Sequence, residues 1–149
     1  MAPAAVPGVA VAAVGIPVAI LIIYIGGLAF GVFVALIAAM AAREVFRIAV
    51  ARDVRPFTWA GVPLAAAFVM IAALSQDATE AAPRFWTLLI VAMLALSGAA
   101  IWLRGVEGKP LTSVGITLFG ALLTGGALTY AIFLGGMAQT WSLPEIADR

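Results

Sequence analysis

Glu44 is the acidic residue whose neighbours most resemble a catalytic environment, because Arg43 and Arg47 flank it at the end of a long apolar stretch. A carboxylate in such a place could transfer protons or hold a divalent metal ion. Both kinds of chemistry need convergent carboxylates. The nearest second acid in this region is Asp53, which lies further along the chain in an expected turn. Glu44 and Arg47 have the spacing at which side chains pair on a helix. We therefore expect an ion pair here, with a catalytic carboxylate as the alternative.

The basic residues around Glu44 suggest a second role for this segment. Arginine side chains at the end of a membrane helix extend toward the interface, where they reach anionic lipid headgroups. We expect ion pairing or lipid-headgroup contact for five residues: Arg43, Glu44, Arg47, Arg52 and Arg55.

Other residue types that carry chemistry are scarce. The sequence contains no cysteine and no histidine, which excludes disulfides, thiol nucleophiles, zinc sites built from these ligands and an imidazole base. It also contains no P-loop, no glycine-rich nucleotide fingerprint and no G-x-S-x-G motif. We expect no catalytic residue, no metal ligand and no cofactor in this chain.

The composition indicates an integral membrane protein. Of the 149 residues, 65% are hydrophobic and 10% are charged, and the mean hydropathy is +1.19. Soluble domains carry roughly 25% charged residues, so this chain could not cover a surface that faces water. There is no basic patch of the kind that nucleic acid requires. The fold class that follows is all-α, a polytopic bundle of transmembrane helices.

The spacing of charged and helix-breaking residues divides the chain into spans. Residues 8–42 carry no charge, yet one helix of that length would measure ~52 Å, against a hydrocarbon core of ~30 Å. A break is therefore needed, and Gly26-Gly27 marks it. We expect one transmembrane domain over 1–149 with five spans, or four and a re-entrant hairpin in place of the first. The expected spans are 9–25, 27–48, 57–74, 84–103 and 114–138, with a polar loop over 76–83.

Tryptophans and basic residues indicate where these spans end and how they are oriented in the membrane. Trp59, Trp86, Trp102 and Trp141 fall near predicted helix ends, as expected for interfacial anchors. Lysine and arginine are concentrated in the connectors 43–56 and 104–113, which the positive-inside rule places in the cytoplasm. We expect the inner membrane of a bacterium, with a cytoplasmic N-terminus and an exported C-terminal tail.

Small residues indicate where helices pack closely. In the second span they recur every four residues, a spacing that lets a neighbouring backbone approach. The last span contains a mid-span Gly pair that could kink it or bring it close to another helix. The expected helix-packing residues are Gly27, Gly31, Ala35, Ala39, Gly120, Gly125 and Gly126. Tyr130 needs a hydrogen-bond partner at its mid-span position, and we expect that partner on a neighbouring helix, with a substrate contact as the alternative. The expected partners of the whole chain are membrane lipids and either other membrane subunits or a second copy.

The first half of the chain resembles a known family. Residues 15–48, GIPVAILIIYIGGLAFGVFVALIAAMAAREVFRI, combine an Ile-Pro step, a Gly-rich break and a long span that ends in small residues, Glu44 and Phe46. This order is similar to the opening of the phosphatidate cytidylyltransferases, also called CDP-diacylglycerol synthases. Residues 52–61, RDVRPFTWAG, resemble the family's first cytoplasmic connector and third span.

The resemblance implies that the catalytic half is missing. In the family, catalysis belongs to a C-terminal half with a Lys-rich signature and acidic residues that hold a divalent metal against CTP. This chain has one lysine, Lys109, and ends at Arg149, where that half would begin. We therefore expect a non-catalytic membrane module, a structural or accessory subunit, with energy-transducing complexes among the assemblies it could join. The alternative is the N-terminal portion of a functional phosphatidate cytidylyltransferase of phospholipid synthesis.

Overall fold

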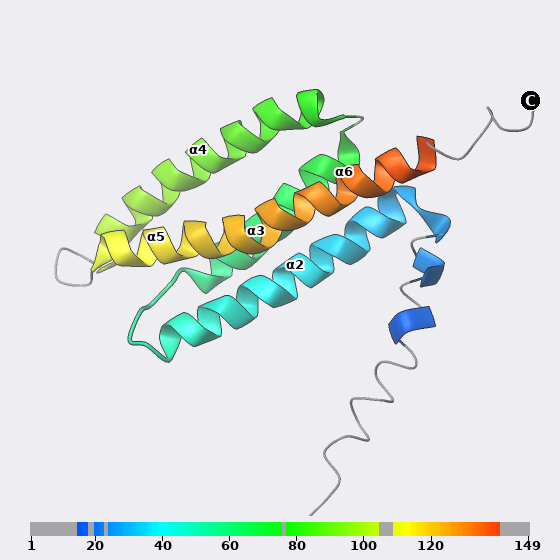
Figure 1. Ribbon diagram of the computed structural model, residues 1–149. Helices are drawn as coiled ribbons and strands as arrows, with labels where there is room; N and C mark the ends of the chain where they lie inside the picture. Colours follow the sequence, from blue (N-terminus) through cyan, green and yellow to red (C-terminus); the bar gives the residue numbers. More distant parts are fainter. Residues whose placement is uncertain (1–14, 18–19, 23, 76, 105–108, 141–149) are drawn as a thin grey trace, which may run out of the picture.

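The protein is a bundle of long helices, as the sequence predicts (Figure 1). The computed structural model describes residues 15–17, 20–22, 24–75, 77–104 and 109–140, without the side chains of residue 104 and of residues 135–140. Its elements are α2 (Gly27–Val50), α3 (Thr58–Leu74), α4 (Ala78–Arg104), α5 (Pro110–Ala121), a π-helical turn η1 (Leu122–Gly126) and α6 (Ala127–Thr140). The described residues contain no β-strand, so the all-α prediction is confirmed.

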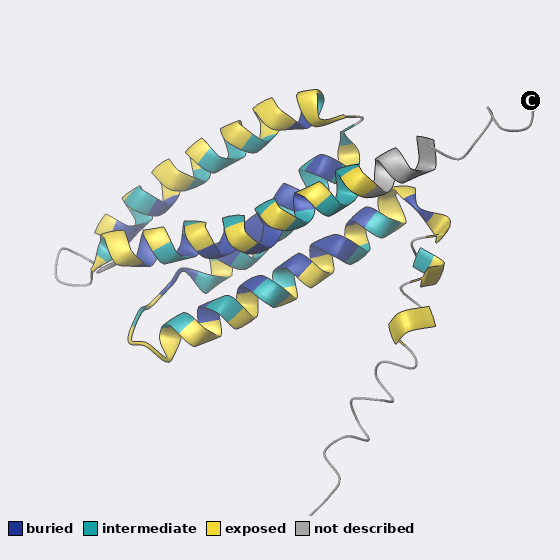
Figure 2. Ribbon diagram, viewed as in Figure 1, coloured by how far each residue is buried: buried dark blue, intermediate teal, exposed yellow. Residues whose placement is uncertain are grey.

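Most of these helices can cross a membrane. Among the described residues, three helical segments are long and apolar enough: Gly27–Val50, Ala78–Leu103 and Pro110–Leu134. The apolar helix α3 is shorter. Large apolar side chains cover the outer surface, including Leu36, Met40, Leu94 and Trp102, and exposed residues lie along every helix (Figure 2). A surface of this kind matches lipid and not water, and the chain is a multi-pass membrane protein.

Helix α3 is the centre of the bundle. It contacts α2, α4, α5, η1 and α6, whereas α4 lies against α5 and α3 at one edge of the molecule (Figure 1). Helices α2, α3, α4 and α5 alternate in direction, so the α2–α3 connection, the end of α4 and the start of α5 lie at one end of the bundle, and the end of α3 and the start of α4 lie at the other (Figure 1). The core side chains around α3 are Phe46, Leu64, Ala65, Phe68 and Ala121.

Helix α2 begins at the predicted glycine break. Gly26 and Gly27 have φ angles of 64° and 56°, a region that residues with a β-carbon enter only at a cost. Residues 15–17, 20–22 and 24–25 before this break are helical. The remainder of the predicted first span, 9–25, lies outside the described residues.

Helix α4 begins at Ala78, so the predicted loop over 76–83 is wrong for residues 78–83. Asp77 is the reason, because its Oδ1 accepts hydrogen bonds from the Glu80 amide at 2.8 Å and from the Thr79 hydroxyl at 2.7 Å. This arrangement is an N-cap, which satisfies amides that a helix start otherwise leaves unpaired. Asp77, Thr79 and Glu80, whose polarity suggests a loop, are therefore the signal of a helix start.

The last predicted span is one helical rod with an irregular centre. It begins at Pro110, a residue that suits the first turn of a helix, and it continues through η1 into α6. The wider π-turn contains Gly125 and Gly126, where the sequence suggested a kink or a close contact. Such turns insert one extra residue into an α-helix and occur often at functional sites.

Candidate functional site at the basic end of the bundle

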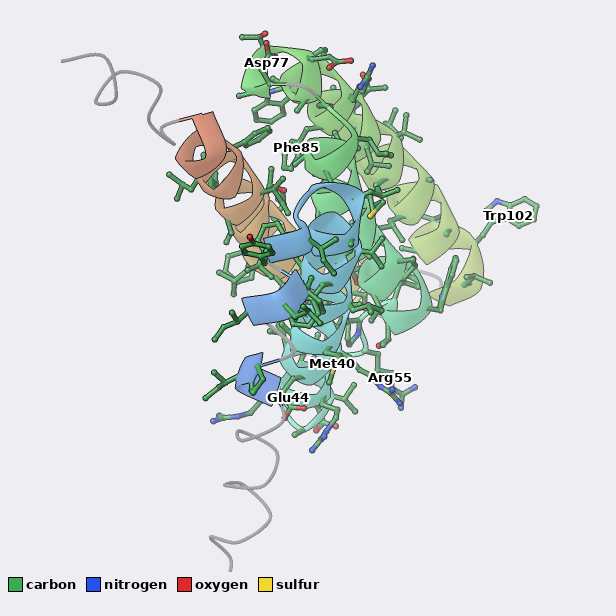
Figure 3. The ribbon with its side chains drawn as sticks, turned by 90° about the vertical axis from the view of Figure 1, so that its right-hand side faces the viewer. Met40, Glu44, Arg55, Asp77, Phe85 and Trp102 are labelled. Atoms are coloured by element: carbon green, nitrogen blue, oxygen red, sulfur yellow. The ribbon has the colours of Figure 1, made fainter. Side chains whose placement is uncertain are left out.

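The basic residues predicted to form a site gather at one end of the bundle. Arg43 and Arg47 lie on the last turns of α2, and Arg52 and Arg55 lie in the connection to α3; all four side chains are exposed. Figure 3 shows Glu44 and Arg55 at this end and Asp77 at the opposite one. The exposed Lys109 directly precedes α5 at the same end. We call this set the basic end: Arg43, Arg47, Arg52, Arg55 and Lys109.

Glu44 takes part in an ion pair. Its Oε2 lies 3.1 Å from Nη1 of Arg47, and both side chains are well exposed. An exposed pair of this kind contributes ~0–1 kcal/mol to stability. Among the described residues, no group of three His, Cys, Asp or Glu side chains is placed to hold a metal ion. The described residues at this end therefore do not form a site of the kind that the resemblance implies for a divalent metal and CTP.

A tight turn holds the arginines of the connection against the end of α2. The amide of Val54 donates to the carbonyl of Ala49, and the amide of Asp53 donates to that of Val50, both at 3.1 Å. Asp53 has a φ of 59°. These bonds form a Schellman motif, which closes the helix end by its own backbone. The turn fixes the path of the chain between Arg52 and Arg55.

Phe46 locks the last turns of α2 into the core. Its ring fills the space that a β-carbon would need at Gly61 on α3 and at Gly120 on α5, and only 1% of the residue is exposed. Phe46 thus acts as a knob that enters a slot between two helices. The slot exists because glycine occupies both of its walls.

A buried hydrogen bond joins α3 to α5 near the same end. The amide of Phe57, which precedes the first turn of α3, donates to Thr117 Oγ1 at 2.8 Å, and the Thr117 hydroxyl donates to the Ser113 carbonyl at 2.7 Å. A helix-start amide that no backbone group satisfies would be costly to bury. From the sequence, Phe46 stands out only through the family resemblance, and neither Phe57 nor Thr117 stands out. The spacing of Ser113 and Thr117, one turn apart on an apolar helix, is the signal that could have found the polar face.

The small-residue ladder of α2 lies only partly on the packing face. Gly31 and Ala35 are buried and Ala39 is half-buried, but Gly27 is exposed, and a β-carbon there would meet nothing within 4 Å. The packing face therefore does not follow the predicted four-residue repeat from Gly27. Each step of four residues rotates the side chain by about 40°, so a strict repeat turns away from one neighbour. The buried residues of α2 instead mix steps of three and four: Gly31, Val34, Ala35, Ala38, Ala42 and Phe46.

The glycines of the last rod lie in different surroundings. Gly120 faces the ring of Phe46, and Gly125 lies against the backbone of Ala65 on α3. Gly126 is less crowded, because a β-carbon there would meet its nearest neighbours, Leu122 and Phe85, at 3.7 Å.

The hydroxyl groups of the last rod bond to the backbone. Thr124 donates to the Gly120 carbonyl at 2.8 Å. The Thr129 hydroxyl lies 3.0 Å from the carbonyl of Gly125 and 3.3 Å from that of Phe68, so it links α6 to α3. Tyr130 is 72% exposed and lies on the outer surface of the bundle, so its hydrogen bond to a neighbouring helix stays a prediction. Thr129, the residue before it, links α6 to α3 within this chain.

The predicted interfacial tryptophans that the structure describes all lie on the outer surface. Trp59 is 70% exposed, Trp86 60% and Trp102 93%; Figure 3 shows Trp102 projecting from α4. Trp59 and Trp102 lie toward the basic end, on the first turn of α3 and the last turns of α4. Trp141 lies outside the described residues.

The opposite end of the bundle has a different charge pattern. Glu80 and Arg84 form an ion pair at 2.7 Å, and Arg84 also donates to the Ser75 hydroxyl at 3.2 Å. The hydrogen bonds from the Thr79 hydroxyl and the Glu80 amide hold the pKa of Asp77 below its ordinary value. Among the described side chains, this end has two acidic groups and one basic group, whereas the basic end has five basic groups and the acids Glu44 and Asp53.

Comparison with known proteins identifies one family. The family model described as the cytidylyltransferase family matches residues 8–143. No curated protein and no solved structure matches the chain. The match covers most of the chain, including the segment 15–48 whose order of motifs suggested this family, and it confirms that resemblance.

Proposed function

The chain belongs to the cytidylyltransferase family, and we propose that it is a membrane-embedded structural module of that family, which packs against lipid and other membrane proteins and transfers no nucleotide itself. One observation carries the proposal. The interior is filled by contacts between helices, with Phe46 in the slot of Gly61 and Gly120 and with Gly125 against Ala65.

The buried polar groups support the same function. In the part of the chain that the structure describes, every buried side-chain nitrogen or oxygen has a hydrogen-bond partner. The hydroxyls of Thr117, Thr124 and Thr129 donate to backbone carbonyls of their own rod. Thr117 also accepts a hydrogen bond from the Phe57 amide just before α3, and Thr129 also lies within hydrogen-bond distance of the Phe68 carbonyl on α3. A site for a nucleotide needs polar groups that point toward the ligand, whereas these groups are used to join helices.

Helix α4 is the surface that we assign to a protein partner. It is the least covered of the long helices. In its apolar 18-residue stretch 11% of the residues are buried, against 28% in that of α2. Gly98 lies on its exposed side, and a β-carbon there would meet nothing within 4 Å. Small residues on a membrane helix permit close approach of a second helix. We place the module in a bacterial inner membrane with the basic end in the cytoplasm and the C-terminal tail exported.

Extraction in a mild detergent followed by native mass measurement tests the structural role. We expect the chain to emerge in a fixed molar ratio with another membrane protein or with a second copy, and Gly98→Leu to abolish that ratio. Gly115→Leu is the matched control, because Gly115 on α5 is also exposed and without close neighbours. A chain that emerges alone with lipid, or an equal loss in both variants, would contradict the accessory role.

A second candidate function follows from the extent of the family match. Because the model of the cytidylyltransferase family covers residues 8–143, the chain could serve as the N-terminal membrane portion of a functional phosphatidate cytidylyltransferase. The two functions differ in whether a catalytic half is joined to this chain. An open reading frame that continues beyond position 149 into a segment rich in lysine and acidic residues would decide for the second function.

A further inference from the structure

The basic end adjoins an apolar surface, and the border between them is the feature of interest. Exposed apolar side chains continue to the last turn of α2, with Met40 73%, Ile48 60% and Val50 57% exposed. Arg43 and Arg47 lie on the same turns of the helix. A membrane supplies such a border at one depth, where acyl chains end and phosphate groups begin.

The charges at this border favour an anion. Glu44 is already paired with Arg47, and Arg43 and Arg52 form no ion pair with any described residue. Guanidinium groups bind phosphate oxygens through two parallel hydrogen bonds, and they lose less hydration than an ammonium group does. The opposite end has an excess of acidic over basic groups among its described side chains. An anionic ligand would therefore prefer the basic end.

Packing and hydrogen bonds form an ordered backbone frame for the segments that carry the arginines. Phe46 anchors the turn between Arg43 and Arg47 in the core, and the Schellman motif around Asp53 fixes the chain before Arg55. The Phe57 amide is bonded to Thr117 just beyond it. A frame that is already ordered loses little conformational entropy when a ligand binds.

We propose that the basic end is a binding site for the phosphate headgroup of an anionic phospholipid, with Arg43 and Arg52 as its principal contacts. The acyl chains of the bound lipid lie along the exposed apolar side chains of α2, and its headgroup lies over the α2–α3 turn. The site belongs to one leaflet only, the one that faces the α2–α3 connection. This inference requires the membrane bundle and does not depend on whether the chain has transferase activity.

Quenching of tryptophan fluorescence by brominated lipids tests the proposal, because the chain has a reporter toward each end. A chain that retains only Trp59, with the other three tryptophans replaced by Phe, reports lipid at the basic end. A chain that retains only Trp86 reports the opposite end. Each is reconstituted in mixtures of brominated phosphatidylglycerol or brominated phosphatidylcholine with unlabelled phosphatidylcholine, and the quenching gives a relative binding constant for the two headgroups.

At Trp59 we expect the anionic lipid to be preferred at least fivefold, the factor that corresponds to about one effective basic residue near a charged surface. The double variant Arg43→Gln, Arg52→Gln should reduce this preference to near one, while Arg84→Gln at the opposite end should leave it unchanged. At Trp86 no such preference is expected.

Three results would overturn the proposal. The first is a relative binding constant near one at Trp59 in the unaltered basic end, and the second is a preference that survives the double variant. The third is displacement of the brominated anionic lipid by inorganic phosphate beyond the effect of chloride at equal ionic strength, since that would identify a site for a free anion. Displacement no greater than that of chloride supports the lipid site.

Discussion

Gly125 and Ala65 lie so close together that a β-carbon at position 125 would overlap the carbonyl oxygen of Ala65 and would lie 2.7 Å from its Cα. Both atoms belong to the backbone in the middle of α3, which cannot move aside as the end of a side chain can. The π-turn η1 brings Gly125 to this position. The contact therefore fixes how the last rod packs against the central helix.

Gly125→Ala should destabilise the bundle by roughly 3 kcal/mol, the upper part of the range for overpacked cores, because the backbones must separate. The measurement is thermal or denaturant unfolding in detergent micelles. Gly126→Ala is the matched control, since its β-carbon would meet its nearest neighbours at 3.7 Å. Replacing that glycine should be neutral or should stabilise the helix by up to about 1 kcal/mol. Equal effects at the two positions would show that the close approach to Ala65 is not a determinant of the packing.

Gly31→Leu should also destabilise the bundle, by ~1–3 kcal/mol. The β-carbon of any residue at position 31 would overlap that of Ala73 on α3, and a larger side chain would hold α2 and α3 apart and lose many dispersion contacts. Leucine at Val32, which is exposed on the next position of the helix, should change the unfolding midpoint much less. If Val32→Leu is as damaging as Gly31→Leu, the small residues reflect composition and not a packing face.

The helices could be predicted from the sequence because their signals are local. Long apolar runs, Gly26-Gly27 and the connectors 43–56 and 104–113 mark spans and breaks within a few residues of where they occur. The start of α4 is harder to predict, because the polarity of Asp77 and Glu80 suggests a loop, whereas the hydrogen bond between them forms a helix cap.

The packing contacts could not be predicted to the same extent, because they depend on which helices become neighbours. Nothing in the local sequence places Phe46 between Gly61 and Gly120, or pairs Phe57 with Thr117 across the bundle. The four-residue repeat beginning at Gly27 was an incomplete guide, since a packing face that stays on one neighbour needs steps of both three and four residues. The arginines were predictable as a group because they cluster in one short connector.

Asp77 should titrate with a midpoint below its ordinary pKa of 3.8, chiefly because the Thr79 hydroxyl and the Glu80 amide donate to its charged form. A depressed folded pKa means that the cap stabilises the start of α4 above about pH 3.8 and that this contribution is lost as the pH falls through the lower folded value. The measurement is the carbon chemical shift of the Asp77 carboxyl group in micelles.

Thr79→Val should raise that midpoint toward 3.8, because it removes the largest cause of the shift. Thr87→Val is the control, since the Thr87 hydroxyl donates to the Pro83 carbonyl and not to Asp77. A midpoint at or above 3.8 in the unaltered chain, or the same change in both variants, would contradict the capping interaction.

The orientation in the membrane can be measured by thiol labelling, because the natural sequence contains no cysteine. Cysteines at Ala51 and Leu111, exposed residues near the two connections of the basic end, should be protected from an impermeant reagent in intact cells. A cysteine at Ala78, exposed near the opposite end, should react. These expectations follow from the excess of basic residues in cytoplasmic connectors. The opposite labelling pattern would require the opposite orientation.

The most direct test of a structural role is pyrophosphate release by the purified 149-residue chain in nanodiscs that contain phosphatidate, with CTP and magnesium added. We predict a rate equal to that of empty nanodiscs, because the interior polar groups are bonded to the backbone and Glu44 is paired with Arg47. The contradictory result is a release that requires both CTP and phosphatidate, persists through purification, disappears in Glu44→Gln and remains in Glu80→Gln.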